Sequence, residues 1–239
     1  MSTLTGGQMR SEELIKSGLE VCRQLADAGF KPCITGSCWL KIKLPDDEIL
    51  IDDVDILCQD FDPEHSPVEV EEHVSEKRTR YFCGLDKKVE IIKELSKGIR
   101  VEDRDFEVYE GIRYMASNDF WMAAALNKTS NYLSLRLQED LYWERYKIIL
   151  PLANCFLARR RGLKIDTKRV AWLMSNHKFT NTRIAHLYNT DLIYIAAVIA
   201  ERYYFHEMNP PDALVMDFCD QVLKPIAKGM GVYGDECWE

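Results

Sequence analysis

A change in residue pattern near Ser117 constrains the fold of this chain more than any other feature of its sequence. Before that point, β-branched and apolar residues alternate with polar ones in short runs that end at glycine, proline or acidic clusters, which is typical of strands. After it, apolar residues recur at helical spacing over long stretches. Strands gathered in one part of a chain and helices in the other predict an α+β fold. We therefore expect a domain with a mixed sheet and helices at residues 11–116, followed by an α-helical domain at 117–239.

The first ten residues, MSTLTGGQMR, are small and polar and look similar to a phage capsid leader that is often used as an expression tag. We expect residues 1–10 to form a disordered tail. A helix is expected to begin at Ser11, a favourable N-cap that is followed by two glutamates, and to end at Gly29.

Composition excludes several classes of protein. With 46% hydrophobic residues among 239, the chain can bury a substantial core and has no bias towards disorder. Its longest uncharged apolar run, at 192–200, is far shorter than the about 20 residues that a bilayer span needs. We expect no membrane partner and, without a signal-peptide pattern, a cytoplasmic protein. The eight cysteines are scattered singly without zinc-ligand spacing, which favours reduced and mostly buried thiols.

Two aspartates share one face of a predicted strand. The segment IDDVDIL, at 51–57, alternates apolar residues with acids. Because strand side chains alternate between faces, Asp53 and Asp55 should point to the same side. A register shifted by one residue would use Asp52 instead of Asp53, but Asp52 would then face away from Asp55.

A third acid, Glu90, lies on another predicted strand. Residues 78–84 and 87–93 have the pattern of a hairpin with its turn between them, and Glu90 belongs to the second strand. Residues 60–76, which precede this hairpin, are polar and contain proline, and we expect a surface loop or a short helix there.

Three carboxylates from two predicted strands suit metal-assisted phosphoryl chemistry. Mg²⁺ sites commonly combine one or two carboxylates with substrate phosphates and water. Asp53 and Asp55 would bridge Mg²⁺ or Mn²⁺ to a nucleoside triphosphate, and Glu90 would complete the metal site near the attacking hydroxyl or accept its proton. Before them, a Gly36-Ser37 turn follows a short apolar run; glycine lets the backbone approach a phosphate, and the amides of a following helix attract anions.

The order of these elements resembles the DNA-polymerase-β-like nucleotidyltransferase superfamily, in particular its minimal, antibiotic-modifying and antitoxin-type members. The pattern of that superfamily is a hydrophobic residue with Gly-Ser, then an Asp-x-Asp strand, then a third carboxylate on a later strand. Here these elements read ITGS at 34–37, IDDVDIL at 51–57 and KVEII at 88–92. The resemblance covers roughly residues 11–130 and implies a nucleotidyltransferase-type mixed sheet as the catalytic core at 11–116.

The resemblance also implies roles for particular residues. Gly36 and Ser37 would contact the nucleotide phosphates, while Asp53, Asp55 and Glu90 would be the catalytic metal ligands.

Two lysines are further candidates for nucleotide contacts. Many minimal members follow Gly-Ser with small residues and an arginine, whereas this chain continues with Cys-Trp-Leu-Lys, so that Lys41 is the basic residue nearest to the turn. The segment GIRYMASNDFWMAAALNK looks like the region after the core in small members, where a helical lysine can meet phosphate; Lys128 would be its counterpart.

The implied activity is metal-dependent transfer of a nucleoside monophosphate from a triphosphate to a hydroxyl, with release of pyrophosphate. The acceptor stays open: the acidic first part, with 20 basic and 29 acidic residues in 1–150, suits a small cationic molecule or a protein. RNA would suit the basic segment at 159–183, although a solvated helix face is the plain alternative for such a segment. Its cations include Arg159, Arg160, Arg161, Lys164, Lys168 and Arg169, with Lys178 and Arg183 further along. A non-catalytic protein that keeps this fold to bind a nucleotide or a partner is the alternative function.

Overall fold

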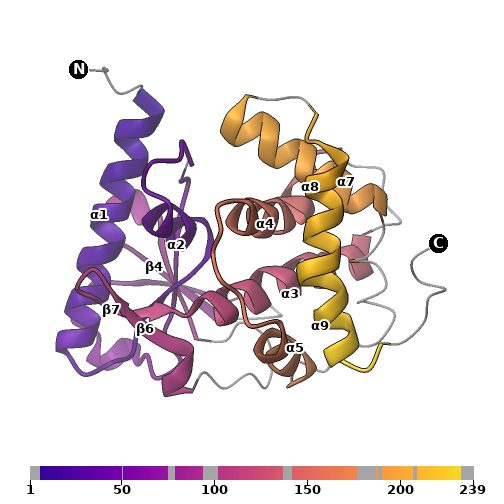
Figure 1. Ribbon diagram of the computed structural model, residues 1–239. Helices are drawn as coiled ribbons and strands as arrows, with labels where there is room; N and C mark the ends of the chain where they lie inside the picture. The colour runs from indigo at the N-terminus through magenta and orange to yellow at the C-terminus, as the bar shows by residue number, and fades with distance from the viewer. Residues whose placement is uncertain are drawn as a thin grey trace. The chain divides into compact units, whose positions relative to one another are not determined.

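The chain consists of two compact units, Met1–Ser117 and Asn118–Glu239 (Figure 1). The sheet and the helices together give the α+β class. The structure, a computed structural model, describes residues 6–49, 51–74, 79–93, 102–136, 142–176, 187, 190–206 and 209–232.

The first unit is built on a seven-stranded mixed sheet with the strand order β3-β4-β5-β2-β1-β7-β6. In this sheet β2 pairs in parallel with β5 and antiparallel with β1, which in turn pairs in parallel with β7. The outer pairs, β3 with β4, β4 with β5 and β6 with β7, are antiparallel. The strands are β1 (Cys33–Ile34), β2 (Val54–Leu57), β3 (Glu71–Val74), β4 (Thr79–Cys83), β5 (Val89–Ile92), β6 (Phe106–Tyr109) and β7 (Ile112–Ala116).

Helix α1 (Gly6–Asp27), indigo in Figure 1, packs against β2, β5 and β7. Its apolar residues recur at helical spacing and are buried, in agreement with the predicted helix. Gly18 lies directly over β2: a Cβ atom added there would stand 2.6 Å from Val54 Cγ1. The side chain of Val54 therefore points at α1, and the buried apolar residues of the helix are Leu14, Val21, Cys22 and Leu25.

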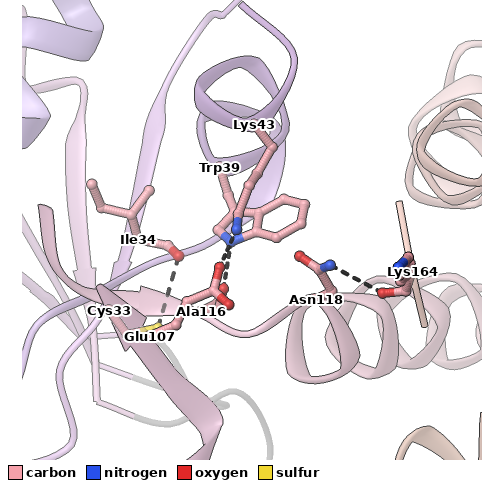
Figure 2. Close-up of polar contacts among 8 residues, drawn as sticks. All are labelled: Cys33, Ile34, Trp39, Lys43, Glu107, Ala116, Asn118 and Lys164. Atoms are coloured by element: carbon pink, nitrogen blue, oxygen red, sulfur yellow. Dashed lines mark hydrogen bonds and ion pairs between the residues drawn. The ribbon is translucent and has the colours of Figure 1, made fainter. Parts of the chain in front are cut away.

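Helix α2 (Gly36–Lys43) is fixed to the β6–β7 hairpin, as Figure 2 shows. The indole Nε1 of Trp39 donates a hydrogen bond of 2.7 Å to the carbonyl of Ala116. The ammonium of Lys43 pairs with the carboxylate of Glu107. It also lies 4.2 Å from the ring centroid of Tyr109. Because Trp39 is fully buried, these contacts hold the helix that follows the Gly-Ser turn in one place.

The described part of the second unit contains helices joined by short turns and no strand. Helix α4 packs against α3 and α7, and α5 packs against α3 and α9. The side-chain amide of Asn118 donates to the carbonyl of Lys164 at 3.0 Å, which joins the start of α3 to the residues before α5 (Figure 2). Among these helices, none combines the length and apolar character that a membrane span requires. The described α-helices of this unit are α3 (Asn118–Arg136), α4 (Tyr142–Arg160), α5 (Thr167–Asn176), α7 (Thr190–Ala200), α8 (Asp212–Phe218) and α9 (Lys224–Gly229). Two π-helical turns lie at Glu201–Phe205 and Cys219–Leu223.

Two segments differ from what the sequence predicts. Residues 6–10, placed in the predicted tail, form the first turns of α1, since a helix that is already held by packing extends readily into residues that tolerate it. Residues 1–5 of that tail lie outside the described part of the chain. Residues 71–74, expected in a loop or a short helix, form strand β3, because pairing with β4 outweighs a weak local preference.

We expect Gly18→Val to lower the free energy of unfolding by about 2 kcal/mol or more, because the added carbons overlap Val54 in a packed contact. Urea unfolding monitored by circular dichroism measures the change. Lys16→Val, at an exposed position of the same helix, is the control for the helix propensity of valine. If both variants lose equal stability, the close approach of α1 to β2 is wrong; relief of the loss by Val54→Ala would support it.

Buried cysteines make stability fall at alkaline pH. Burial raises the pKa of the Cys38 thiol well above its usual range and that of Cys83 to about 11. An unfolded thiol loses its proton above about pH 8.5 while the folded one keeps it, so the free energy of unfolding decreases as pH rises through this window. We therefore expect the decrease in the free energy of unfolding from pH 8 to pH 10, measured by urea unfolding, to be smaller for Cys38→Ala than for the wild type. Equal losses would contradict the raised pKa of Cys38.

Candidate functional site

Two of the three predicted carboxylates lie side by side on neighbouring strands. In the parallel ladder of β2 and β5, Asp55 is the register partner of Glu90. Partners in neighbouring strands, about 4.8 Å apart, project from the same face of the sheet. Because Val54 points at α1, the next residue, Asp55, projects from the opposite face, and Glu90 projects with it. The hairpin predicted from the sequence is confirmed by the antiparallel pairing of β4 with β5.

The Gly-Ser turn closes against Asp55. A Cβ atom added to Gly36 would lie 2.7 Å from Asp55 Oδ2, and the φ angle of Gly36 is +67°. The backbone amide of Thr35 donates to the carbonyl of Asp55 at 3.0 Å. Position 36 thus requires glycine both for its backbone conformation and for the space that the carboxylate occupies. Helix α2 begins at this residue, and Ser37 is its second residue, partly exposed.

Asp53 precedes β2 directly, is exposed, and lines a pocket of about 440 Å³ together with Glu90. The structure therefore brings Asp53 to Glu90 in one pocket and Asp55 to Glu90 in one ladder. The remaining residues of the pocket wall are Arg80, Phe82, Asp86, Lys87 and Lys88, all from the β4–β5 hairpin.

Asp55 and Asp53 also act on a neighbouring thiol. The pKa of Cys38, in the first half of α2, is raised by burial and next by the negative charges of Asp55 and Asp53. Cys38 is 1% exposed. Both observations describe a protonated thiol that serves as a packing residue, because nucleophilic chemistry needs a thiolate.

An ion pair that the sequence analysis missed joins Arg80 to Glu90. Arg80 Nε lies 3.1 Å from Glu90 Oε1, and Arg80 Nη1 donates to Glu90 Oε2 at 3.3 Å. The Glu90 side chain is 10% exposed and that of Arg80 is 33% exposed, so the pair is partly shielded from water. The hairpin register provides the missing signal. Phe82 pairs with Glu90, so Arg80, two residues earlier, lies on the same face and diagonal to Glu90.

The two predicted lysines have different surroundings. The ammonium of Lys41 donates to the carbonyl of Pro45 at 2.8 Å and also to that of Asp47, and Lys41 does not line the pocket. The ammonium of Lys41 is therefore engaged outside the pocket wall. Lys128 is exposed on α3, in the second unit.

The carboxylates of this site carry oxygen atoms of the kind that bind divalent cations. Asp53, Asp55 and Glu90 supply oxygen ligands of the kind that Mg²⁺ and Mn²⁺ take. Gly36 lets the backbone of the Gly-Ser turn lie against the Asp55 carboxylate, where a Cβ atom would clash with it. Within the described ranges, no group of three or more His, Cys, Asp or Glu side chains that could hold a metal ion is found. The three carboxylates thus carry suitable oxygen atoms without being gathered as a metal-binding group.

Two arginines of the predicted basic segment pair with acids of the second unit. Arg160 pairs with Glu201, whose side chain is fully buried, and Arg159 Nη2 lies 3.6 Å from Asp217 Oδ2. Their charges are therefore offset within the unit, which lowers their contribution to any phosphate contact.

The other cations of this segment are nearer to solvent. The guanidinium of Arg161 lies 4.4 Å from the ring centroid of Phe205, and that of Arg169 lies 4.2 Å from that of Trp172, which is 44% exposed. Lys164 and Lys168 are exposed. Lys178 and Arg183 lie outside the described residues.

A double-mutant cycle on Arg80→Ala and Glu90→Gln should give a coupling of about 0.5–2 kcal/mol in the free energy of unfolding, because the pair is partly shielded. The same cycle on Lys87 and Glu71, an ion pair between two exposed side chains, is the matched control and should give a smaller coupling. Additive effects at Arg80 and Glu90 would show that the two side chains do not interact in solution.

Comparison of the chain with protein-family models, with curated proteins and with solved structures finds no match.

Proposed function

We propose that this protein transfers a nucleoside monophosphate from a nucleoside triphosphate to a hydroxyl and releases pyrophosphate, using a nucleotidyltransferase-type core in its first unit. The observation that carries the proposal is the register of Asp55 with Glu90, together with the approach of Gly36 to Asp55. These contacts gather the three separate motifs of the sequence on one face of the sheet. An ordinary solvent-exposed strand has no need of a glycine with positive φ against its carboxylate.

The order and pairing of the elements support the same proposal. The chain runs from α1 through β1 to the Gly-Ser turn and α2, then to β2 with its aspartates and later to β5 with its glutamate. In the sheet β2 lies between β1 and β5, so its carboxylates have the turn on one side and Glu90 on the other. Each motif of the superfamily that the sequence resembles thus has a place beside the next.

The residues would divide the work as follows. Asp53, Asp55 and Glu90 would hold Mg²⁺ or Mn²⁺, while the backbone at Gly36 and the hydroxyl of Ser37 would donate hydrogen bonds to phosphate oxygens. Divalent metal bound there neutralises phosphate charge and lowers the pKa of a coordinated hydroxyl.

One observation favours a second candidate function. Arg80 already binds Glu90, so this carboxylate is offset by a protein cation in the arrangement that the structure shows. A protein that binds a nucleotide or a partner without catalysis needs no third carboxylate for a metal. The second candidate is therefore a non-catalytic binding protein that uses the same turn and pocket.

The acceptor hydroxyl would belong to a small molecule, a protein or an RNA. For RNA, the supporting feature is the exposed Trp172 with the stacked guanidinium of Arg169, since a base can stack on an aromatic face and a cation can meet phosphate. Lys164 and Lys168 would add positive charge there.

We expect Asp53→Asn and Asp55→Asn each to reduce pyrophosphate release from labelled triphosphates by about 100-fold or more, because each removes an anionic metal ligand. The assay combines each of the four triphosphates with Mg²⁺ or Mn²⁺ and candidate acceptors. Asp52→Asn is the matched control, since Asp52 is an exposed aspartate next to Asp53 that does not line the pocket. It should keep near wild-type rates.

Transfer that survives the combined Asp53→Asn and Asp55→Asn substitutions would contradict the metal site. If the wild type binds triphosphate but releases no pyrophosphate with any acceptor, the non-catalytic candidate is the correct one. Thermal unfolding of each variant checks that a lost activity is not a lost fold.

A further inference from the structure

The wall of the pocket beside Asp53 carries three cations to which the sequence analysis assigns no role. Arg80, Lys87 and Lys88 all come from the β4–β5 hairpin and lie in the same pocket wall as Asp53 and Glu90. A metal–triphosphate complex carries charge of both signs, with a cation next to several phosphate oxygens. A pocket with carboxylates and ammonium groups together is complementary to such a complex, whereas an all-acidic pocket would repel the phosphates.

The turn that presents the lysines has an unusual backbone. Asp86 and Lys87 have φ angles of 50° and 55°, in the left-handed region that side chains other than glycine rarely adopt. Neighbouring elements hold this turn: the amide of Leu85 donates to Ser17 Oγ of α1 at 2.9 Å, and the amide of Val54 donates to the carbonyl of Lys88 at 2.9 Å. The lysines are therefore presented by a fixed turn.

The three cations differ in what they already bind. Arg80 pairs with Glu90. Lys87 pairs with Glu71, which raises the pKa of Lys87 and keeps it an ammonium. Lys88 is exposed, and within the described residues its ammonium makes no ion pair. Among these three cations, Lys88 is thus the one that would break no ion pair within the described residues when an anion binds in the pocket.

We infer that the β4–β5 hairpin forms a phosphate-binding subsite, with Lys88 as its principal contact and with Lys87 and Arg80 adding positive charge. This inference rests on the proposed function and assigns the phosphates of its substrate to residues outside the Gly-Ser motif. The basic residue nearest to that motif is Lys41, and its ammonium is engaged by the carbonyls of Pro45 and Asp47. The hairpin supplies the positive charge that α2 does not direct to the pocket.

The test measures binding of Mg²⁺–ATP and of inorganic tripolyphosphate with Mg²⁺ to the full chain by isothermal titration calorimetry. Lys88→Gln should raise the Kd of both ligands about five- to tenfold. The ratio of the Kd of the variant to that of the wild type should decrease at high salt, because salt screens exposed charges. Lys31→Gln is the matched control: it removes the same charge from an exposed lysine beside Asp60, past the far end of β2 from Asp53. Its Kd should equal that of the wild type.

The outcomes separate this inference from the proposed function. If the wild type binds both ligands and Lys88→Gln binds them equally well, as does Lys87→Gln/Lys88→Gln, the subsite is overturned while the proposed function stands. If Lys88→Gln weakens tripolyphosphate binding but the wild type transfers no nucleotide, the subsite stands and the transferase proposal fails. Absence of binding by the wild type overturns both.

Discussion

The parallel ladder between β2 and β5 determines where every charged group of the candidate site lies. It places Glu90 beside Asp55, and the antiparallel pairing of β5 with β4 then places Arg80 diagonal to Glu90. The same ladder carries the amide of Val54 to the carbonyl of Lys88 and so ties the hairpin turn to the strand that follows Asp53. A shift of one residue in this ladder would turn the carboxylates to the opposite face.

Because side chains alternate along β2, a residue that packs in the core and an acidic residue of the candidate site lie on opposite faces of the sheet. Val54 and Ile56 are fully buried, and Val54 contacts α1 at Gly18. Asp55 faces the other way, against Gly36. The strand can therefore place a carboxylate at the site without exposing the packed contact between α1 and the sheet. This arrangement also explains why two glycines distant in sequence, Gly18 and Gly36, approach the same strand from its two faces.

The sequence was sufficient to predict those elements of the fold that depend on a local residue pattern. The hairpin around Glu90 follows from side-chain periodicity and turn residues and is present in the structure. Of the segment IDDVDIL, residues Val54–Leu57 form a strand, which contains Asp55 and begins after Asp53. The ion pair of Arg80 with Glu90 depends on the register of the hairpin. The hydrogen bond of Lys41 to the carbonyl of Pro45 depends on the path of the loop after α2. Neither is fixed by residue type alone. Strand β3 forms because β4 offers it a partner, which composition does not reveal.

The left-handed residues of the hairpin turn have a consequence for how this chain evolves. A non-glycine residue in that conformation costs of order 1 kcal/mol, and glycine at Asp86 or Lys87 would relieve the cost. A more stable turn with glycine would spread where the side chain has no task. Retention of a charged side chain at position 87 across related sequences would therefore mark selection for the charge itself, at the expense of backbone stability.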